Sequence, residues 1–170
     1  MDVTGYHLHR RYDPILNRAA AIADQAAALV QQRMREPMPA TRIVVAKEGN
    51  CPLALIENYR ATLGTELWPP ARPATDYMGI TTVSPDGALI VINADEHDGS
   101  LRQLDETLVH ELVHAVQLGR PGKRDEELRG VRHNFGLERM RIRSAWKQNR
   151  ATRIDEREAQ ALEYLARDLR

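Results

Sequence analysis

Residues 110–114 of the chain read His-Glu-Leu-Val-His, so two histidines stand four positions apart with a glutamate between them. In an α-helix of about 3.6 residues per turn, positions i and i+4 lie one above the other on the same face. The imidazoles of His110 and His114 can therefore reach one cation. Neutral imidazole suits zinc, and a catalytic zinc site has three protein ligands and an open position for water. The spacing predicts one zinc ion per chain, with Glu111 placed to take a proton from that water.

The residues around this motif predict the helix that would hold it. Apolar residues recur at helical spacing and form a face fit for burial; they are Leu101, Leu104, Leu108, Val109, Leu112, Val113, Ala115 and Val116. Gly119 and Pro121 follow as stop signals. We expect a helix over residues 101–118 with the motif at a buried site.

The remaining patterns predict a single α+β domain over residues 1–170, in which helices flank a small mixed sheet. Residues 14–35 predict a helix, with Asp13 as its N-cap and Pro14 in its first turn. Other helices are expected at 53–63 and 154–169. Short β-branched runs predict strands, the last two joined by the turn Ser-Pro-Asp-Gly into a hairpin; these runs are 41–46, 79–83 and 88–93.

Composition restricts the partners and the compartment. The chain has 24 basic and 24 acidic residues, a formal net charge of zero, which argues against nucleic acid or a membrane surface as the main partner. Its one cysteine, the absence of a leader pattern and the absence of a long apolar window favour a cytoplasmic protein. A basic run is expected to form the solvated face of a helix; it comprises Arg129, Arg132, Arg139, Arg141, Arg143, Lys147, Arg150 and Arg153.

The third metal ligand is less obvious than the two histidines. Gln117 and Arg120 stand where a compact H-E-x-x-H-x-x-G-x-x-H site would have its glycine and third histidine, so that arrangement is excluded. Glu156, Glu158, His133 and Cys51 are the candidates. Glu156 and Glu158 lie about 200° apart around a helix, so only one of them can face the metal. The adjacent Asp155 is expected to cap the C-terminal helix.

Residues 156–160, Glu-Arg-Glu-Ala-Gln, resemble the E-x-x-A-[D/N] sequence of the gluzincins, with Gln160 in the position of the acidic or amide residue. The order of a strand ending at Asn93, a polar loop and the motif helix is similar to that of small bacterial gluzincins of the minigluzincin and ImmA/IrrE-like kind. The resemblance covers about residues 81–118 and 155–167. It implies a zincin-like fold, a hairpin packed on the active-site helix, and Glu156 as the third ligand on a later helix.

This resemblance also implies a zinc-dependent endopeptidase whose substrate is a polypeptide bound in extended form. The strand at 89–93 would then be a sheet edge that pairs with the substrate, although an interior hairpin is an equal alternative. Glu111 would act as general base toward the metal-activated water. His133 and Tyr164 are candidate catalytic donors to the oxyanion, and Tyr77 is a weaker one.

Cys51 permits a second resemblance. The sequence Glu-Gly-Asn-Cys-Pro-Leu at 48–53 is faintly similar to the E-G-C-L loop of peptide deformylases, which supplies a cysteine ligand. Asn50 interrupts that loop, and Val113 replaces the aspartate of the H-E-x-D-H motif. We therefore expect Cys51 to be a small core residue.

Two other functions compete with a peptidase. In one, the chain is a catalytically silent or self-occluded zinc-binding regulatory or interaction domain, with its cleft covered by the tail 168–170 and the basic segment 129–153. In the other, the motif is fortuitous and the chain is a metal-free helical scaffold. The sequence does not specify an oligomeric state.

Overall fold

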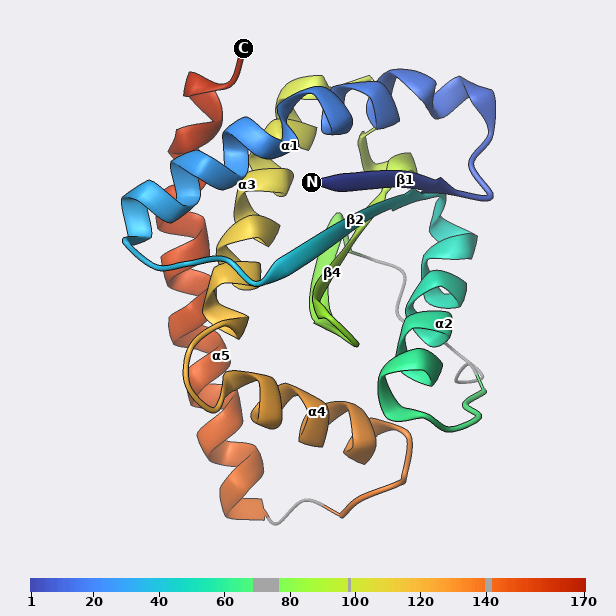
Figure 1. Ribbon diagram of the computed structural model, residues 1–170, viewed down its shortest axis with the longest axis vertical. Coiled ribbons are helices and arrows are strands. Elements are labelled where there is room, and N and C mark those ends of the chain that lie inside the picture. The colour runs from blue at the N-terminus through green and yellow to red at the C-terminus, as the bar shows by residue number, and fades with distance from the viewer. Residues whose placement is uncertain (69–76, 98, 140–141) are drawn as a thin grey trace.

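A computed structural model describes residues 1–68, 77–97, 99–139 and 142–170, which form five α-helices around a four-stranded sheet (Figure 1). The strands are β1 (Asp2–Tyr6), β2 (Ala40–Ala46), β3 (Gly79–Ser84) and β4 (Gly87–Asn93). The helices are α1 (Asp13–Met34), α2 (Cys51–Leu63), α3 (Leu101–Leu118), α4 (Lys123–Asn134) and α5 (Ile142–Leu162). Short 3₁₀ helices are η1 (Arg10–Tyr12), η2 (Glu48–Asn50), η3 (Ala94–His97) and η4 (Glu163–Asp168). The mixed α+β class is confirmed.

The sheet has the order β1-β2-β4-β3, and only its last pair is antiparallel. β2 pairs in parallel with β1 and β4, which places Ile43 beside Ile90. The predicted hairpin is confirmed, because Ser84 pairs with Gly87 across the turn. β4 is therefore an interior strand, so of the two alternatives the interior hairpin is confirmed and the free edge formed by residues 89–93 is wrong. That edge belongs to β3, its hairpin partner.

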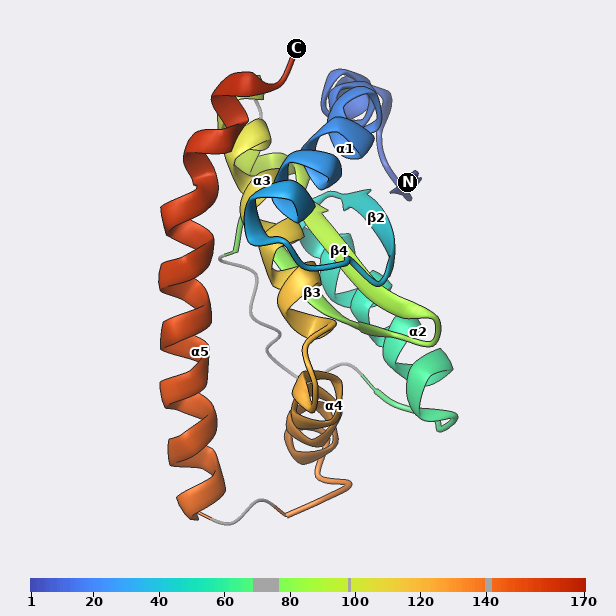
Figure 2. The ribbon, with the colours of Figure 1, turned by 60° about the vertical axis from the view of Figure 1, so that its left-hand side comes forward.

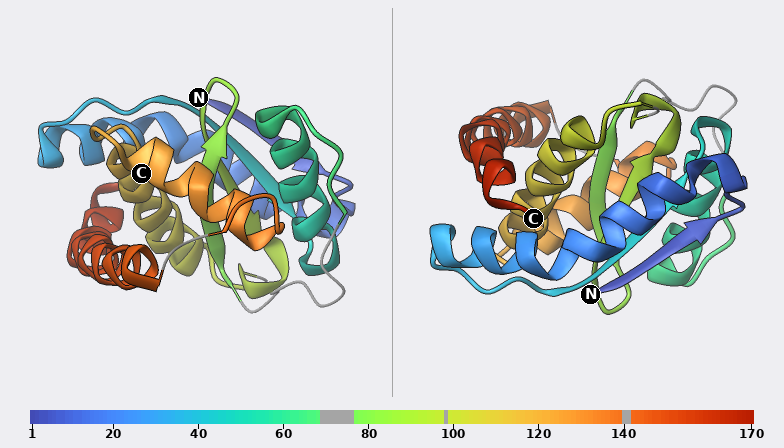
Figure 3. Two further views of the ribbon diagram at one scale, coloured as in Figure 1. Left: turned by 90° about the horizontal axis from the view of Figure 1, so that it is seen from below. Right: turned by 90° about the horizontal axis from the view of Figure 1, so that it is seen from above.

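Side-chain alternation along the strands divides the core into two layers. Ile43, Val45, Ile90 and Ile92 point toward α1 and α3, whereas Val44, Ala46, Leu89 and Val91 point toward α2. α3 and α2 lie on opposite sides of the sheet, and α5 runs along the outer side of α3 (Figures 2 and 3). α3 is thus held between the sheet and α5.

The apolar stripe of α3 explains why its position is fixed. Leu104, Leu108, Leu112, Val113 and Val116 are fully buried, and Ser100 caps the first turn by accepting a hydrogen bond from the backbone N–H of Gln103 at 3.2 Å. The predicted bounds of this helix, 101–118, are confirmed. None of the described helices combines the length and apolar character that crossing a bilayer requires.

The C-terminal helix differs from its prediction. α5 begins at Ile142 instead of residue 154, and its last turns tighten into η4. Asp155 therefore lies inside a helix and cannot be an N-cap; its carboxylate contacts the ammonium of Lys123 at 2.5 Å. Asp13 is likewise the first helical residue and not the cap of α1, because Tyr12 takes the cap position.

The predicted solvent-facing basic run divides between two helices. Arg129 and Arg132 are exposed on α4, Arg139 is exposed in the segment after that helix, and Arg153 is exposed on α5. Arg141 lies outside the described residues, as do the side chains of Arg143, Lys147 and Arg150.

Candidate metal centre

α3 and α5 bring two histidines and one glutamate together. His110 and His114 lie on the face of α3 that turns away from the core, and Glu156 extends from the neighbouring α5. The two Nε2 atoms are 3.1 Å apart. Glu156 carboxylate oxygens lie 3.5 Å from Nε2 of His110 and 3.4 Å from Nε2 of His114. This group can hold a metal ion.

The size of this triangle fits a small tetrahedral cation. Zinc bonds of about 2.0–2.1 Å in tetrahedral geometry separate the ligand atoms by about 3.3–3.4 Å. The three measured separations, 3.1, 3.4 and 3.5 Å, surround that value. The protein therefore holds the donor atoms near the positions they would occupy around an ion.

Hydrogen bonds on the outer side of each imidazole orient the rings toward the centre of the triangle. Nδ1 of His110 lies 2.8 Å from a carboxylate oxygen of Glu163, and Nδ1 of His114 lies 2.7 Å from the amide oxygen of Gln117. Because both partners are acceptors, each Nδ1 carries the proton and each Nε2 presents a lone pair. Two lone pairs at 3.1 Å repel one another, and a cation between them removes that repulsion.

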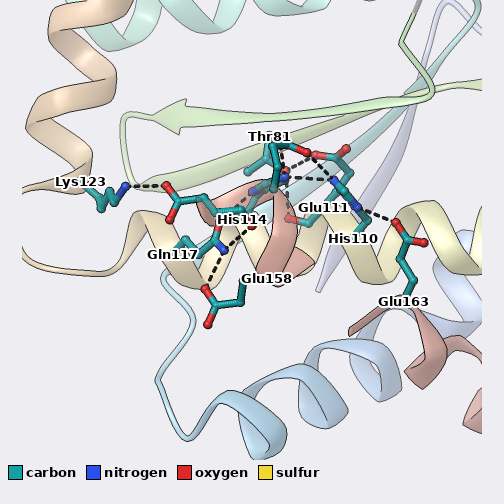
Figure 4. A network of polar contacts seen from close by, with 10 residues as sticks. Thr81, His110, Glu111, His114, Gln117, Lys123, Glu158 and Glu163 are labelled. Atoms are coloured by element: carbon teal, nitrogen blue, oxygen red, sulfur yellow. Dashed lines mark hydrogen bonds and ion pairs between the residues drawn. The ribbon is translucent and has the colours of Figure 1, made fainter. Parts of the chain in front are cut away.

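The amide of Gln117 is itself oriented by two acceptors. Its Nε2 donates to the backbone oxygen of Asp155 at 3.0 Å and to Glu158 at 2.9 Å (Figure 4). Glu158 also forms an ion pair with Arg120 at 2.8 Å, and this guanidinium holds the pKa of the Glu158 carboxyl below its usual value. Glu158 therefore supports the ring of His114 through Gln117, while Glu156 faces the histidines.

Glu111 lies beside the triangle in a nearly dry position. Its side chain is 6% exposed, and Thr81 donates its hydroxyl to carboxylate oxygen Oε2 at 2.6 Å. Burial raises the pKa of Glu111 to about 7, against the opposing effects of His114 and Thr81. A carboxyl with such a pKa is suited to exchange protons near neutral pH.

Gly79 makes room for this carboxylate. A Cβ atom on Gly79 would lie 2.8 Å from Cγ and 2.9 Å from Oε1 of Glu111, closer than van der Waals contact allows. The backbone of β3 therefore approaches Glu111 closely only because residue 79 has no side chain.

β3 presents a free backbone edge next to the triangle. The N–H of Asn93 donates to the oxygen of Met78 at 3.0 Å, so the alternating antiparallel pattern directs the polar backbone groups of Ile80 and Thr82 toward β4. Those of Gly79 and Thr81 then point away from the sheet. Within the described ranges no strand pairs with this side of β3.

The edge of β3 borders a cleft that extends on both sides of the histidines. One part, of about 330 Å³, is lined by Gly79, Thr81, Glu111 and the three candidate ligands, together with residues of α4. A second hollow shares Gly79, His110 and Glu111 and continues past Met78 and Gln103 toward Glu163. The triangle thus lies in the middle of an elongated depression.

The structure does not bring the other predicted catalytic residues to this cleft. His133 is exposed near the end of α4, where its Nδ1 lies 3.1 Å from the backbone oxygen of Glu138. Tyr164 directly follows Glu163, so it points to another side of η4, and its hydroxyl accepts a hydrogen bond from Arg33 of α1 at 2.9 Å. Tyr77 packs in the layer on the α2 side of the sheet.

Cys51 is a core residue, as predicted. It is 1% exposed under α2, on the opposite face of the sheet from α3, and burial raises its pKa to about 12. A thiol in that position cannot ligate an ion held by the histidines. The deformylase-like arrangement is therefore absent from the described residues.

The C-terminal tail lies away from the cleft. Leu169 is buried in the core layer shared by α1 and α3, and Gln25 of α1 donates to the backbone oxygen of Asp168 at 3.0 Å. The prediction that residues 168–170 could cover the cleft is therefore wrong.

Comparisons with known proteins returned no match to a family model, a curated protein or a solved structure. Two oriented imidazoles and a carboxylate bind a divalent cation, and a buried carboxylate beside them can move a proton.

Proposed function

We propose that this protein is a zinc-dependent endopeptidase with a zincin-like fold and a gluzincin-type site formed by His110, His114 and Glu156. The observation that carries the proposal is the triangle of donor atoms separated by 3.1–3.5 Å, with both histidines oriented from behind by Glu163 and Gln117. Two imidazoles and one carboxylate with an open fourth position are typical ligands of catalytic zinc.

When bound, zinc supplies a Lewis acid that polarises a carbonyl group and lowers the pKa of a water molecule to about 7. The chain itself supplies the proton transfers. Thr81 occupies Oε2 of Glu111, which leaves Oε1 to accept a proton from the attacking water and to pass it to the leaving amine nitrogen. Burial of this carboxylate excludes competing solvent from the transfer.

The substrate class follows from the edge of β3. The free N–H and C=O groups of Gly79 and Thr81 can pair with an extended peptide, which adds a strand to the sheet beside Glu111. Because the cleft continues in both directions from the triangle, a bound chain can extend past the site on either side. This geometry favours cleavage of internal peptide bonds.

One observation favours a catalytically silent zinc-binding regulatory or interaction domain as the second candidate. Neither His133 nor Tyr164 reaches the cleft, and the ammonium of Lys123, which lines it, is paired with Asp155. The predicted donors and the ammonium of Lys123 are thus not available to stabilise an oxyanion, a role that would then fall mainly to the metal.

The decisive experiment combines metal content with hydrolysis. Elemental mass spectrometry of the purified protein should find about one zinc per chain, lost in Glu156→Ala and kept in Glu158→Ala. Wild type should cleave members of a peptide library derived from a digested proteome, and Glu111→Gln should keep its zinc but cleave none. Stoichiometric zinc without any cleavage would support the silent domain, and absence of zinc after reconstitution would reject both.

A further inference from the structure

One end of the cleft is lined by acidic residues. On the side of α4 the lining includes the acidic residues Glu126 and Glu127. Both residues belong to the first half of α4, which lies below the hairpin of β3 and β4 in Figure 1. Each is partly buried, in contrast to the exposed neighbour Asp125.

These two carboxylates have no cation opposite them among the described residues. Lys123 is the one described cation in the lining, and its ammonium is 2.5 Å from Asp155. A divalent metal at the triangle would be balanced by Glu156 and Glu111. Among the described lining residues, Glu126 and Glu127 then leave a formal charge of about two negative units.

Glu127 is partly buried and lies close to the edge strand β3. Its Oε1 lies 3.5 Å from the hydroxyl of Thr82, at the edge strand that borders the cleft. Burial raises its pKa, and the hydroxyl of Thr82 and the nearby ammonium of Lys123 only partly oppose this effect. A partly desolvated carboxylate attracts a cation more strongly than one in open water does.

We infer that Glu126 and Glu127 select polypeptides that carry a lysine or arginine side chain close to the bond that is cleaved. This inference rests on the proposed function and specifies its substrate. A peptide paired with the edge of β3 is extended, so its side chains alternate in direction and every second one points to the same side. One such side chain on the α4 side of the triangle reaches the two carboxylates.

The inference is tested first by cleavage. A peptide cleaved by wild type is resynthesised with lysine, alanine or glutamate at each position in turn, and kcat/KM is measured for each. At one position on one side of the scissile bond, lysine should be favoured over alanine by about tenfold and glutamate disfavoured. In the double variant Glu126→Gln/Glu127→Gln this preference should disappear, so that the ratio of kcat/KM for the lysine peptide to that for the alanine peptide falls to about one. Asp125→Asn removes a charge from the exposed side of the same helix and should leave the preference intact.

Binding provides a second readout that does not need turnover. Glu111→Gln, loaded with zinc, is titrated with fluorescent peptides of the lysine, alanine and glutamate series. Tighter binding of the lysine peptide, weakened by added salt and by the double glutamine change, is the expected result. Equal affinity for the three peptides, or a lysine preference that survives the double change, overturns the inference. A wild type that cleaves no peptide but binds lysine peptides selectively would reject the peptidase and retain the acidic wall as a selector of cationic peptides.

Discussion

The carboxylate of Glu163 lies 2.8 Å from Nδ1 of His110, on the side of the ring opposite to Nε2 and its partner His114. Glu163 follows Glu156 by seven residues, about two helical turns, so both carboxylates face α3. One is placed to ligate the metal and the other to orient a ligand. This pairing fixes the proton of His110 on Nδ1 and leaves Nε2 free for a cation.

The first prediction concerns this pairing. Glu163→Ala should weaken zinc binding about 10- to 100-fold without removing a ligand, because His110 loses the acceptor that holds its ring and raises its basicity. The affinity is measured by competition with a chromogenic chelator. Tyr164→Phe, at the adjacent residue that contacts α1, is the matched control and should bind zinc like wild type. Equal affinities for Glu163→Ala and the control would show that His110 needs no support from Glu163.

The sequence predicted the core of the site because its signals are local. The i, i+4 spacing of His110 and His114 needs only a helix, and the apolar stripe of α3 specifies that helix and its burial. The hairpin was equally accessible, since a Ser-Pro-Asp-Gly turn joins two β-branched runs. Each of these features depends on residues close to one another in the chain.

What the sequence did not reveal depends on packing between distant segments. Thr81 and Gly79 belong to an ordinary strand pattern, and only the approach of β3 to α3 gives them a role beside Glu111. β1 is short and half polar, so it has no alternation strong enough to predict it. Gln117 and Glu163 did carry a signal, since one follows His114 by three positions and the other follows Glu156 by seven.

The second prediction concerns Gly79, which has no side chain. Gly79→Ala should lower kcat at least about tenfold and leave zinc content unchanged, because its Cβ would lie 2.8 Å from Cγ and 2.9 Å from Oε1 of Glu111 and would displace this side chain, not the ligands. Steady-state kinetics and elemental analysis of the same sample test this. Gly49→Ala is the control, since a Cβ there meets nothing within 4 Å. An active Gly79→Ala variant would mean that Glu111 has room to move.

The third prediction distinguishes the role of the Thr81 hydroxyl from the role of the Thr81 backbone groups. Thr81→Val keeps the shape and the edge of β3 but removes the donor to Glu111, so kcat should fall about 10- to 100-fold with little change in KM. Thr81→Ser retains the hydroxyl and should recover most of the rate. If valine and serine variants are equally active, the 2.6 Å contact does not serve to position the base.

The fourth prediction concerns the stabilisation of the folded protein by zinc. In the proposed site zinc would bind the native triangle much more tightly than it binds the unfolded chain. Zinc should therefore stabilise the protein by about 2.7 kcal/mol when its free concentration is 100 times Kd. Differential scanning calorimetry with and without a chelator measures the shift. Glu156→Ala should show little or no shift, whereas a shift as large as that of wild type would place the third ligand elsewhere.

The last prediction follows from the burial of Glu127. Its pKa is raised above the ordinary value of 4.5, so the folded protein holds this proton more tightly than the unfolded chain. Between the two pKa values the native state binds more protons, and the free energy of unfolding therefore falls as pH rises. The loss of stability caused by burying the ionised carboxylate is absent below the pKa of Glu127 in the unfolded chain. It is complete above the pKa of Glu127 in the folded protein. The neutral amide of Glu127→Gln removes it.

Urea denaturation of the metal-free protein measures this effect. The midpoint for Glu127→Gln should exceed that of wild type at pH 8, and the two should converge near pH 4, where the carboxyl is protonated in both states. Asp125→Asn, at an exposed position of the same helix, should show no such pH-dependent difference. A Glu127→Gln variant that is less stable than wild type at pH 8 would mean that the folded protein already stabilises the charged form of Glu127. This carboxylate would then not favour binding of a cationic side chain in the cleft.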